Sequence, residues 1–69
     1  MLESHDRIRQ NQMIVRKTGE LACAVTRLNW SVLYETLEET FELCRTIERL
    51  AREIENDTSV FREMLEEER

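Results

Sequence analysis

The chain has 69 residues and a net charge of −5, with 36% charged residues, a single glycine and no proline. This composition is typical of long helices with solvated flanks and excludes a turn-rich β fold. A chain of this length forms at most one domain, whose core rarely supplies more than roughly 3–5 kcal/mol without a disulfide, a metal or a partner chain. We therefore expect one all-α module, residues 1–69, that relies on further contacts for its stability.

Acidic residues are concentrated in the second half of the chain. Residues 35–69 carry five arginines and twelve acidic residues, whereas residues 1–34 carry five basic and three acidic residues. An excess of seven negative charges argues against a nucleic-acid surface on this half. The basic residues of the N-terminal third are expected to meet acidic side chains of another helix, as an antiparallel arrangement would allow. These residues are Arg7, Arg9, Arg16 and Lys17.

The sequence also carries signals of the cellular compartment. No apolar run reaches the 18 or so residues that a membrane span requires, and the first twenty residues lack the apolar centre of a secretory signal. These features predict an intracellular, cytoplasmic protein. Asn29 and Asn56 each begin an N-x-S/T sequon, which leaves an extracellular fragment as the alternative to a chance match. Cys23 and Cys44 would lie about 31 Å apart on one helix, so they are interpreted as buried thiols, with a symmetric interchain disulfide as the alternative.

Residues 4–17 predict a modest N-terminal helix. Acidic residues stand near its start and Arg16 and Lys17 near its end, as the helix dipole favours. Its apolar content is thin, so it would not stay folded alone. Gly19 fits the position after a helix C-terminus, which makes Thr18-Gly19 the first predicted turn. The alternative is an exposed glycine inside a continuous helix.

Residues 20–55 predict the main helix. Its first part is the most apolar section of the chain, with apolar residues at Leu21, Val25, Leu28, Trp30, Val32 and Leu33. A helix that is apolar on most of its circumference has more than one neighbour. The same stripe would continue into the charged residues Glu35 and Glu39, so the pattern changes phase near residues 29–31. We expect a continuous or kinked helix there, with a break and a helix N-cap as the alternative.

The strongest periodicity runs from Leu33 to Leu65. Spacings of four and three predict the contact stripe of a helix that packs against another helix. Its members are Leu33, Leu37, Thr40, Cys44, Ile47, Ala51, Ile54, Thr58, Phe61 and Leu65. Phe41, Leu43 and Leu50 lie beside the stripe and widen it beyond a two-stranded coiled coil, which indicates three or more helices in cross-section. Polar residues at 56–59 compete with helical bonding, so residues 59–68 form a last helix or a continuation.

Catalytic and metal-binding patterns are missing from the sequence. The single histidine, His5, has no partner at metal-ligand spacing, and no glycine-rich phosphate loop is present. Glu35, Glu38, Glu39 and Glu42 include carboxylate pairs, but no Glu-x-x-His unit accompanies them. We therefore predict neither enzyme activity nor a cofactor, a metal or a small-molecule substrate.

The sequence favours a non-enzymatic interaction module, a scaffold, adaptor or oligomerisation element that self-associates or pairs with another helical subunit. The alternative is a small helical regulator that binds nucleic acid through its basic N-terminal third. The predicted interface residues are Leu21, Val25, Leu28, Trp30, Val32, Leu33, Leu37, Phe41, Cys44, Ile47, Ala51, Ile54, Phe61 and Leu65.

Overall fold

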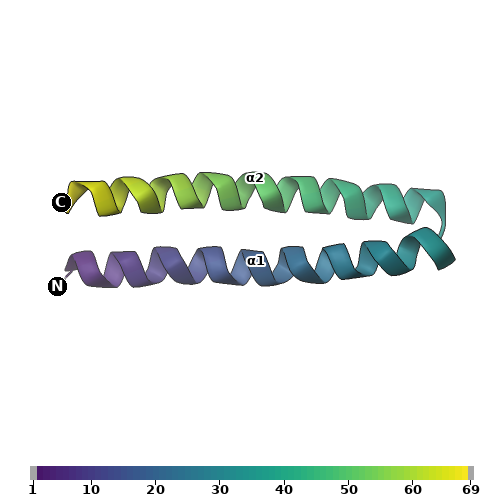
Figure 1. Ribbon diagram of the computed structural model, residues 1–69, viewed down its shortest axis with the longest axis horizontal. Helices are drawn as coiled ribbons and strands as arrows, with labels where there is room; N and C mark the ends of the chain where they lie inside the picture. Colours follow the sequence, from purple (N-terminus) through teal and green to yellow (C-terminus); the bar gives the residue numbers. More distant parts are fainter. Residues whose placement is uncertain (1, 69) are drawn as a thin grey trace.

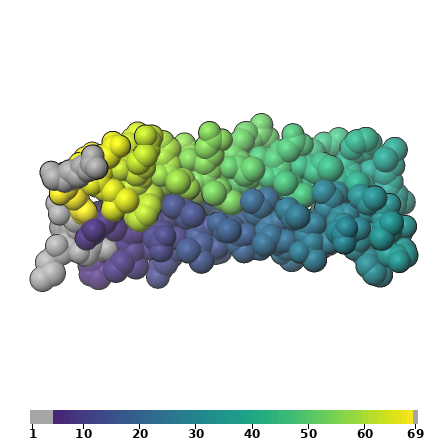
Figure 2. All heavy atoms as spheres, in the orientation of Figure 1, coloured from purple at the N-terminus to yellow at the C-terminus, as the bar shows by residue number. Residues whose placement is uncertain are grey.

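The chain folds into a helical hairpin of two long antiparallel helices (Figure 1). The computed structural model describes residues 2–68, with side chains from residue 5 onward. Helix α1 spans Leu2–Tyr34 and helix α2 spans Leu37–Glu67. The hairpin measures 49 × 14 × 13 Å, and the two helices touch along their whole length (Figure 2). The prediction of an all-α fold with packed helices is confirmed.

The chain reverses at Glu35 and Thr36, where a capping box starts α2. Thr36 has extended backbone angles, and its side chain accepts a hydrogen bond of 3.2 Å from the backbone N–H of Glu39. In return the Thr36 backbone N–H donates to Glu39 Oε2 at 3.2 Å. These two bonds satisfy N–H groups that have no partner within the helix. The Glu39 carboxylate is also stabilised by the positive end of the helix dipole.

The predicted division into helices at 4–17 and 20–55 is wrong, because α1 continues through Thr18 and Gly19. The Thr18 hydroxyl donates to the Ile14 carbonyl at 2.7 Å, so this polar side chain is satisfied inside the helix. Gly19 does not adopt a positive φ, which is the conformation that a helix-ending glycine would need.

The predicted main helix over residues 20–55 is also wrong at residues 35 and 36, since α1 ends at Tyr34 and α2 begins at Leu37. Residues 29–31, where the apolar pattern changes phase, lie within α1, so the alternative of a break there is wrong and the helix ends several residues later. Ser31 is fully buried, and its hydroxyl shares a hydrogen bond of 2.7 Å with the hydroxyl of Thr40. This contact keeps residues 29–31 in α1 and against α2.

Residues 59–68 continue α2 and do not form a separate helix. The polar residues at 56–59 leave the helix intact because the most buried of them, Asp57, faces Lys17 of α1 and forms an ion pair with it. The competition with backbone bonding that the sequence indicates therefore has no effect here.

The contact between the helices uses a row on each that repeats at spacings of three and four. The α1 contact row is Gln10, Ile14, Lys17, Leu21, Ala24, Leu28 and Ser31. The α2 contact row is Thr40, Leu43, Ile47, Leu50, Ile54, Asp57, Phe61 and Met64. Half of the α2 row was predicted, but the other half lies one residue earlier, with Leu43 and Leu50 in place of Cys44 and Ala51. The larger side chains take the inner positions because they remove more apolar area from water.

The apolar core is thin. Among the described residues only Ala24, Leu43 and Leu50 are buried apolar residues, with 7%, 9% and 2% of their surface exposed. A core this small gives little hydrophobic stabilisation to set against the conformational entropy of the chain.

Candidate interaction surface

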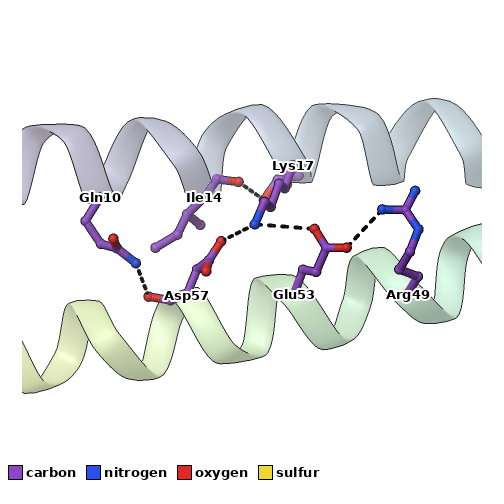
Figure 3. Close-up of polar contacts among 7 residues, drawn as sticks. Gln10, Ile14, Lys17, Arg49, Glu53 and Asp57 are labelled. Atoms are coloured by element: carbon purple, nitrogen blue, oxygen red, sulfur yellow. Dashed lines mark hydrogen bonds and ion pairs between the residues drawn. The ribbon is translucent and has the colours of Figure 1, made fainter.

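A chain of polar contacts links the two helices near the middle of the contact rows (Figure 3). Lys17 Nζ lies 2.6 Å from Asp57 Oδ2 and 3.4 Å from Glu53 Oε1. Arg49 Nη1 contacts the second Glu53 oxygen, Oε2, at 2.9 Å, and Gln10 Nε2 donates to the Asp57 backbone carbonyl at 2.8 Å. Each ionised group therefore has an opposite charge beside it.

These contacts shift two pKa values. The hydrogen bond to Asp57 raises the pKa of Lys17 above its ordinary value of 10.5, although partial desolvation opposes the effect. The hydrogen bond from Arg49, followed by the one from Lys17, lowers the pKa of Glu53 below its ordinary value of 4.5. Both shifts favour the charged forms of Lys17 and Glu53.

The network confirms that basic residues of the N-terminal third meet acidic residues of another helix, here their own α2. Lys17 contacts Glu53 and Asp57, and Arg7 Nη1 lies 3.0 Å from Glu68 Oε2. Two of the four basic residues considered for nucleic-acid binding are thus engaged with carboxylates of the same chain.

Many large apolar side chains remain on the surface of the hairpin. From residue 5 to residue 68, eleven of them have at least 40% of their surface exposed. They are Ile8, Val15, Val25, Trp30, Val32, Leu33, Tyr34, Leu37, Phe41, Val60 and Leu65. Single exposed apolar residues need no explanation, but a contiguous set indicates a binding surface.

Most of these residues fall on one side of the hairpin. Because the helices run in opposite directions, the residue that follows an inner contact residue turns to the same side on both helices. On this side α1 presents the α1 face row, which consists of Ile8, Asn11, Val15, Thr18, Ala22, Val25, Asn29 and Val32. The α2 face row, nearest to α1, consists of Leu37, Cys44, Ala51, Thr58 and Leu65, and an outer row of Phe41, Glu48, Glu55 and Arg62 borders it and carries charge. Together the two face rows form what we call the charge-free face.

The absence of charge on this side of α1 is extensive. Twelve exposed positions carry no ionisable group, namely the eight of the α1 face row and the neighbouring Gln12, Gly19, Thr26 and Leu33. With 36% charged residues in the chain, about four of twelve positions would be charged if charges were spread evenly. The charged residues of α1 between residues 9 and 27 lie on other sides of the helix, whereas Arg7 lines the groove beside Ile8 and Asn11 at the open end of the hairpin.

Surface grooves agree with this division of the hairpin. One groove is bordered by Arg7, Ile8 and Asn11 of α1 and by Phe61 and Leu65 of α2, so the two face rows lie on the same side at this end of the hairpin. A groove on the other side brings Asp6 beside Glu67. The hairpin therefore has an apolar side and a charged side.

The predicted interface residues divide between two environments. Five half-buried residues lie in the contact rows between the helices, namely Leu21, Leu28, Ile47, Ile54 and Phe61. Cys44 is half-buried at the edge of the charge-free face, and the remaining eight residues are exposed. The exposed ones are Val25, Trp30, Val32, Leu33, Leu37, Phe41, Ala51 and Leu65. Their role in an interface with another molecule stays a prediction.

Sequence reasoning missed the N-terminal part of the charge-free face. Ile8, Val15 and Ala22 repeat every seven residues, which is a detectable signal of one helix face. The predicted turn at Thr18-Gly19 separated them and hid this repeat.

Trp30 lies away from this face, on the other side of α1. Its ring contacts that of Tyr34 with a centroid separation of 4.3 Å, and both residues are exposed near the turn. Of the fourteen predicted interface residues, Trp30 is therefore one that the fold does not bring together with the charge-free face.

Two further sequence features take their places in the helices. Asn29 and Asn56, the first residues of the two sequons, are exposed within continuous helix. Cys23 and Cys44 lie on different helices and are both free. Cys23 is exposed, so its prediction as a buried thiol is wrong.

Comparisons with protein-family models, curated proteins and solved structures found no match. In the described part of the chain no group of three or more potential ligands is placed to hold a metal ion. Neither helix, over the residues described, has a stretch both long and apolar enough to cross a membrane.

Proposed function

We propose that this chain is a non-enzymatic interaction module that binds another helical surface, of its own kind or of a partner subunit, through the charge-free face. The observation that carries this proposal is the twelve exposed, uncharged positions along α1, in a chain rich in charge. Solvated helices normally present charged residues on the face opposite their core.

The thin core supports the same proposal. Of the apolar residues whose side chains are described, only three are buried within the hairpin, whereas Val25 and Leu37 are 49% and 71% exposed. Covering such residues would stabilise the fold by about 25 cal/mol for each Å² of apolar area removed from water. A module of this kind gains a substantial part of its stability from the molecule that it binds.

The test places a charge on the face and a matched charge away from it. Val25→Glu puts a carboxylate in the charge-free face, whereas Cys23→Glu makes the same change on the other side of α1. Burying an unpaired carboxylate costs about 3 kcal/mol or more, which lowers an association constant by about two orders of magnitude. Sedimentation velocity and circular dichroism then measure the mass and the helicity of each variant.

We expect the wild type and Cys23→Glu to sediment as assemblies and Val25→Glu to sediment as a folded or partly folded single chain. An assembled wild type whose mass is unchanged in Val25→Glu would contradict the proposed role of this face.

A further inference from the structure

Building on the proposed function, we infer that the molecule covering the charge-free face is a second copy of this chain, related by a two-fold axis perpendicular to the helices. The two hairpins would form a four-helix bundle in which α1 packs against α1 and α2 against α2, both antiparallel. An interface of this kind requires a surface that is complementary to itself.

The α1 face row has this property, because its residues have the same chemistry when read in either direction. An antiparallel copy centred at residue 20 places Ile8 against Val32 and Val15 against Val25. The same alignment places the small residues Thr18 and Ala22 together beside the axis. Branched apolar side chains therefore meet each other, and the small residues allow the two helices to approach closely.

Asn11 and Asn29 are polar members of the same pattern, and Asn11 of one copy would face Asn29 of the other. A carboxamide both donates and accepts hydrogen bonds, so two of them can pair inside an apolar interface. A polar pair at one level of a helix interface fixes the register, since any shift leaves both groups without partners.

The α2 face row is symmetric as well, about Ala51. Leu37 and Leu65 lie fourteen residues on either side of it, and the small residues Cys44 and Thr58 lie seven residues on either side. An antiparallel second copy would thus place leucine against leucine and small residue against small residue.

The two centres of symmetry coincide in the folded hairpin. In an antiparallel hairpin, two residues at the same level have numbers that add up to a nearly constant value. This value is 67 for Gln10 and Asp57, 71 for Ser31 and Thr40, and 75 for Arg7 and Glu68. Residue 20 is therefore level with residue 51, because these sums are centred on 71. One two-fold axis satisfies both face rows, whereas an unrelated partner would impose no such symmetry on either.

The size of the face suits a stable dimer. The hairpin is 49 Å long, and two helices side by side are roughly 20 Å wide, so the face covers about 1,000 Å² per chain. Stable interfaces of standard size bury about 800 Å² on each partner. At the outer edge of this interface, Glu48 would lie near Glu55 of the second copy. Arg52 lies within one helical turn of both glutamates in its own chain, so its positive charge offsets their repulsion.

Thiol cross-linking tests this arrangement. Cys44 and Thr58 are about 21 Å apart along one helix, yet Cys44 of one copy would face Thr58 of the other. In a Cys23→Ser background, Thr58→Cys should give a covalent dimer under mild oxidation, at least roughly tenfold faster than the control Ser59→Cys, because a disulfide needs close and well-oriented thiols. Ser59 follows Thr58 and lies on the outer side of α2.

A distance measurement gives a second, independent readout. In a Cys23→Ser, Cys44→Ala background, spin labels at Arg62→Cys should be separated by about 33 Å, twice the rise from Ala51 to Arg62. A two-fold axis parallel to the helices would give one short separation, about 10–20 Å, at every position along the chain.

The outcomes separate this inference from the proposed function. A short distance at position 62, no cross-link in Thr58→Cys, equal cross-linking in Ser59→Cys, or an assembly of three or more chains overturns the two-fold arrangement and leaves the interaction module in place. A wild-type chain that is monomeric and only partly folded also overturns the two-fold arrangement and leaves the interaction module in place, because it points to a different partner. A single, cooperatively folded wild-type chain overturns both.

Discussion

Thr36 determines where the chain reverses. Its hydroxyl and the Glu39 carboxylate each accept a hydrogen bond from the backbone N–H of the other residue, and both groups lie at the start of α2. Without these bonds the first N–H groups of the helix would depend on water alone.

Thr36→Ala should lower the free energy of unfolding by about 1 kcal/mol, because the alanine side chain cannot accept the hydrogen bond. Thr36→Ser keeps the acceptor oxygen and should stay close to the wild type. Urea denaturation followed by circular dichroism measures both variants. An unchanged midpoint for Thr36→Ala would contradict the role of the capping box.

The capping box could have been predicted from the sequence, since Thr36 and Glu39 fit the S/T-x-x-E pattern ahead of an apolar run. It was missed because Leu33 and Leu37 are spaced as in one helix, and that spacing carried the predicted stripe across the turn. At Thr18-Gly19 the opposite error occurred, because residues that favour a turn were accommodated within α1. Local signals alone do not decide between these cases, since packing along the whole helix overrides weak propensities.

The contact row of each helix combines apolar packing with one central ionic network. Lys17, Glu53 and Asp57 lie in or beside the contact rows, and Arg49 extends the network outward. Such a group gives little net stability when it is paired, but loss of one partner leaves a poorly solvated charge behind. The network therefore favours one alignment of α1 on α2.

The pKa shifts predict a hairpin that is less stable in acid and in strong base. The lowered pKa of Glu53 means that its contribution is present above 4.5 and lost as pH falls through the lowered value. The raised pKa of Lys17 means that its contribution is present below 10.5 and lost as pH rises through the raised value. Thermal melting across this pH range measures both effects.

Lys17 is the only lysine of the chain, which gives the alkaline effect a clean control. Lys17→Met should reduce the loss of stability above pH 10.5, and Glu53→Gln should reduce the loss in acid. A melting temperature that keeps its full pH dependence in both variants would show that these groups do not stabilise the hairpin.

The contact face of α2 could be predicted only in part. Thr40, Ile47, Ile54 and Phe61 were assigned correctly from their period of seven. The alternate positions could be filled by either of two adjacent rows, and the row with the larger apolar residues Leu43 and Leu50 also contains the charged residue Asp57. The choice depended on Lys17, which lies forty residues away in the sequence and supplies the charge that Asp57 needs.

At the scale of the whole molecule, two helices cover too little of their own apolar surface. The hairpin buries one side of each helix and leaves the charge-free face in contact with water. The apolar residues predicted as one interface are divided between the contact rows and the surface, and the sequence did not reveal which of them are used within the hairpin. That assignment needed the position of the turn, because it determines which residues of α1 and α2 lie at the same level.

The mass and the melting behaviour of the wild-type chain together test the central claim most directly. Sedimentation equilibrium at two concentrations should give the mass of an assembly, two chains for the arrangement inferred above. The melting temperature should rise with concentration, because association stabilises the folded state by mass action. A mass of 8.3 kDa at both concentrations, with a cooperative melt at a constant temperature, would show that the hairpin needs no partner and would contradict the claim.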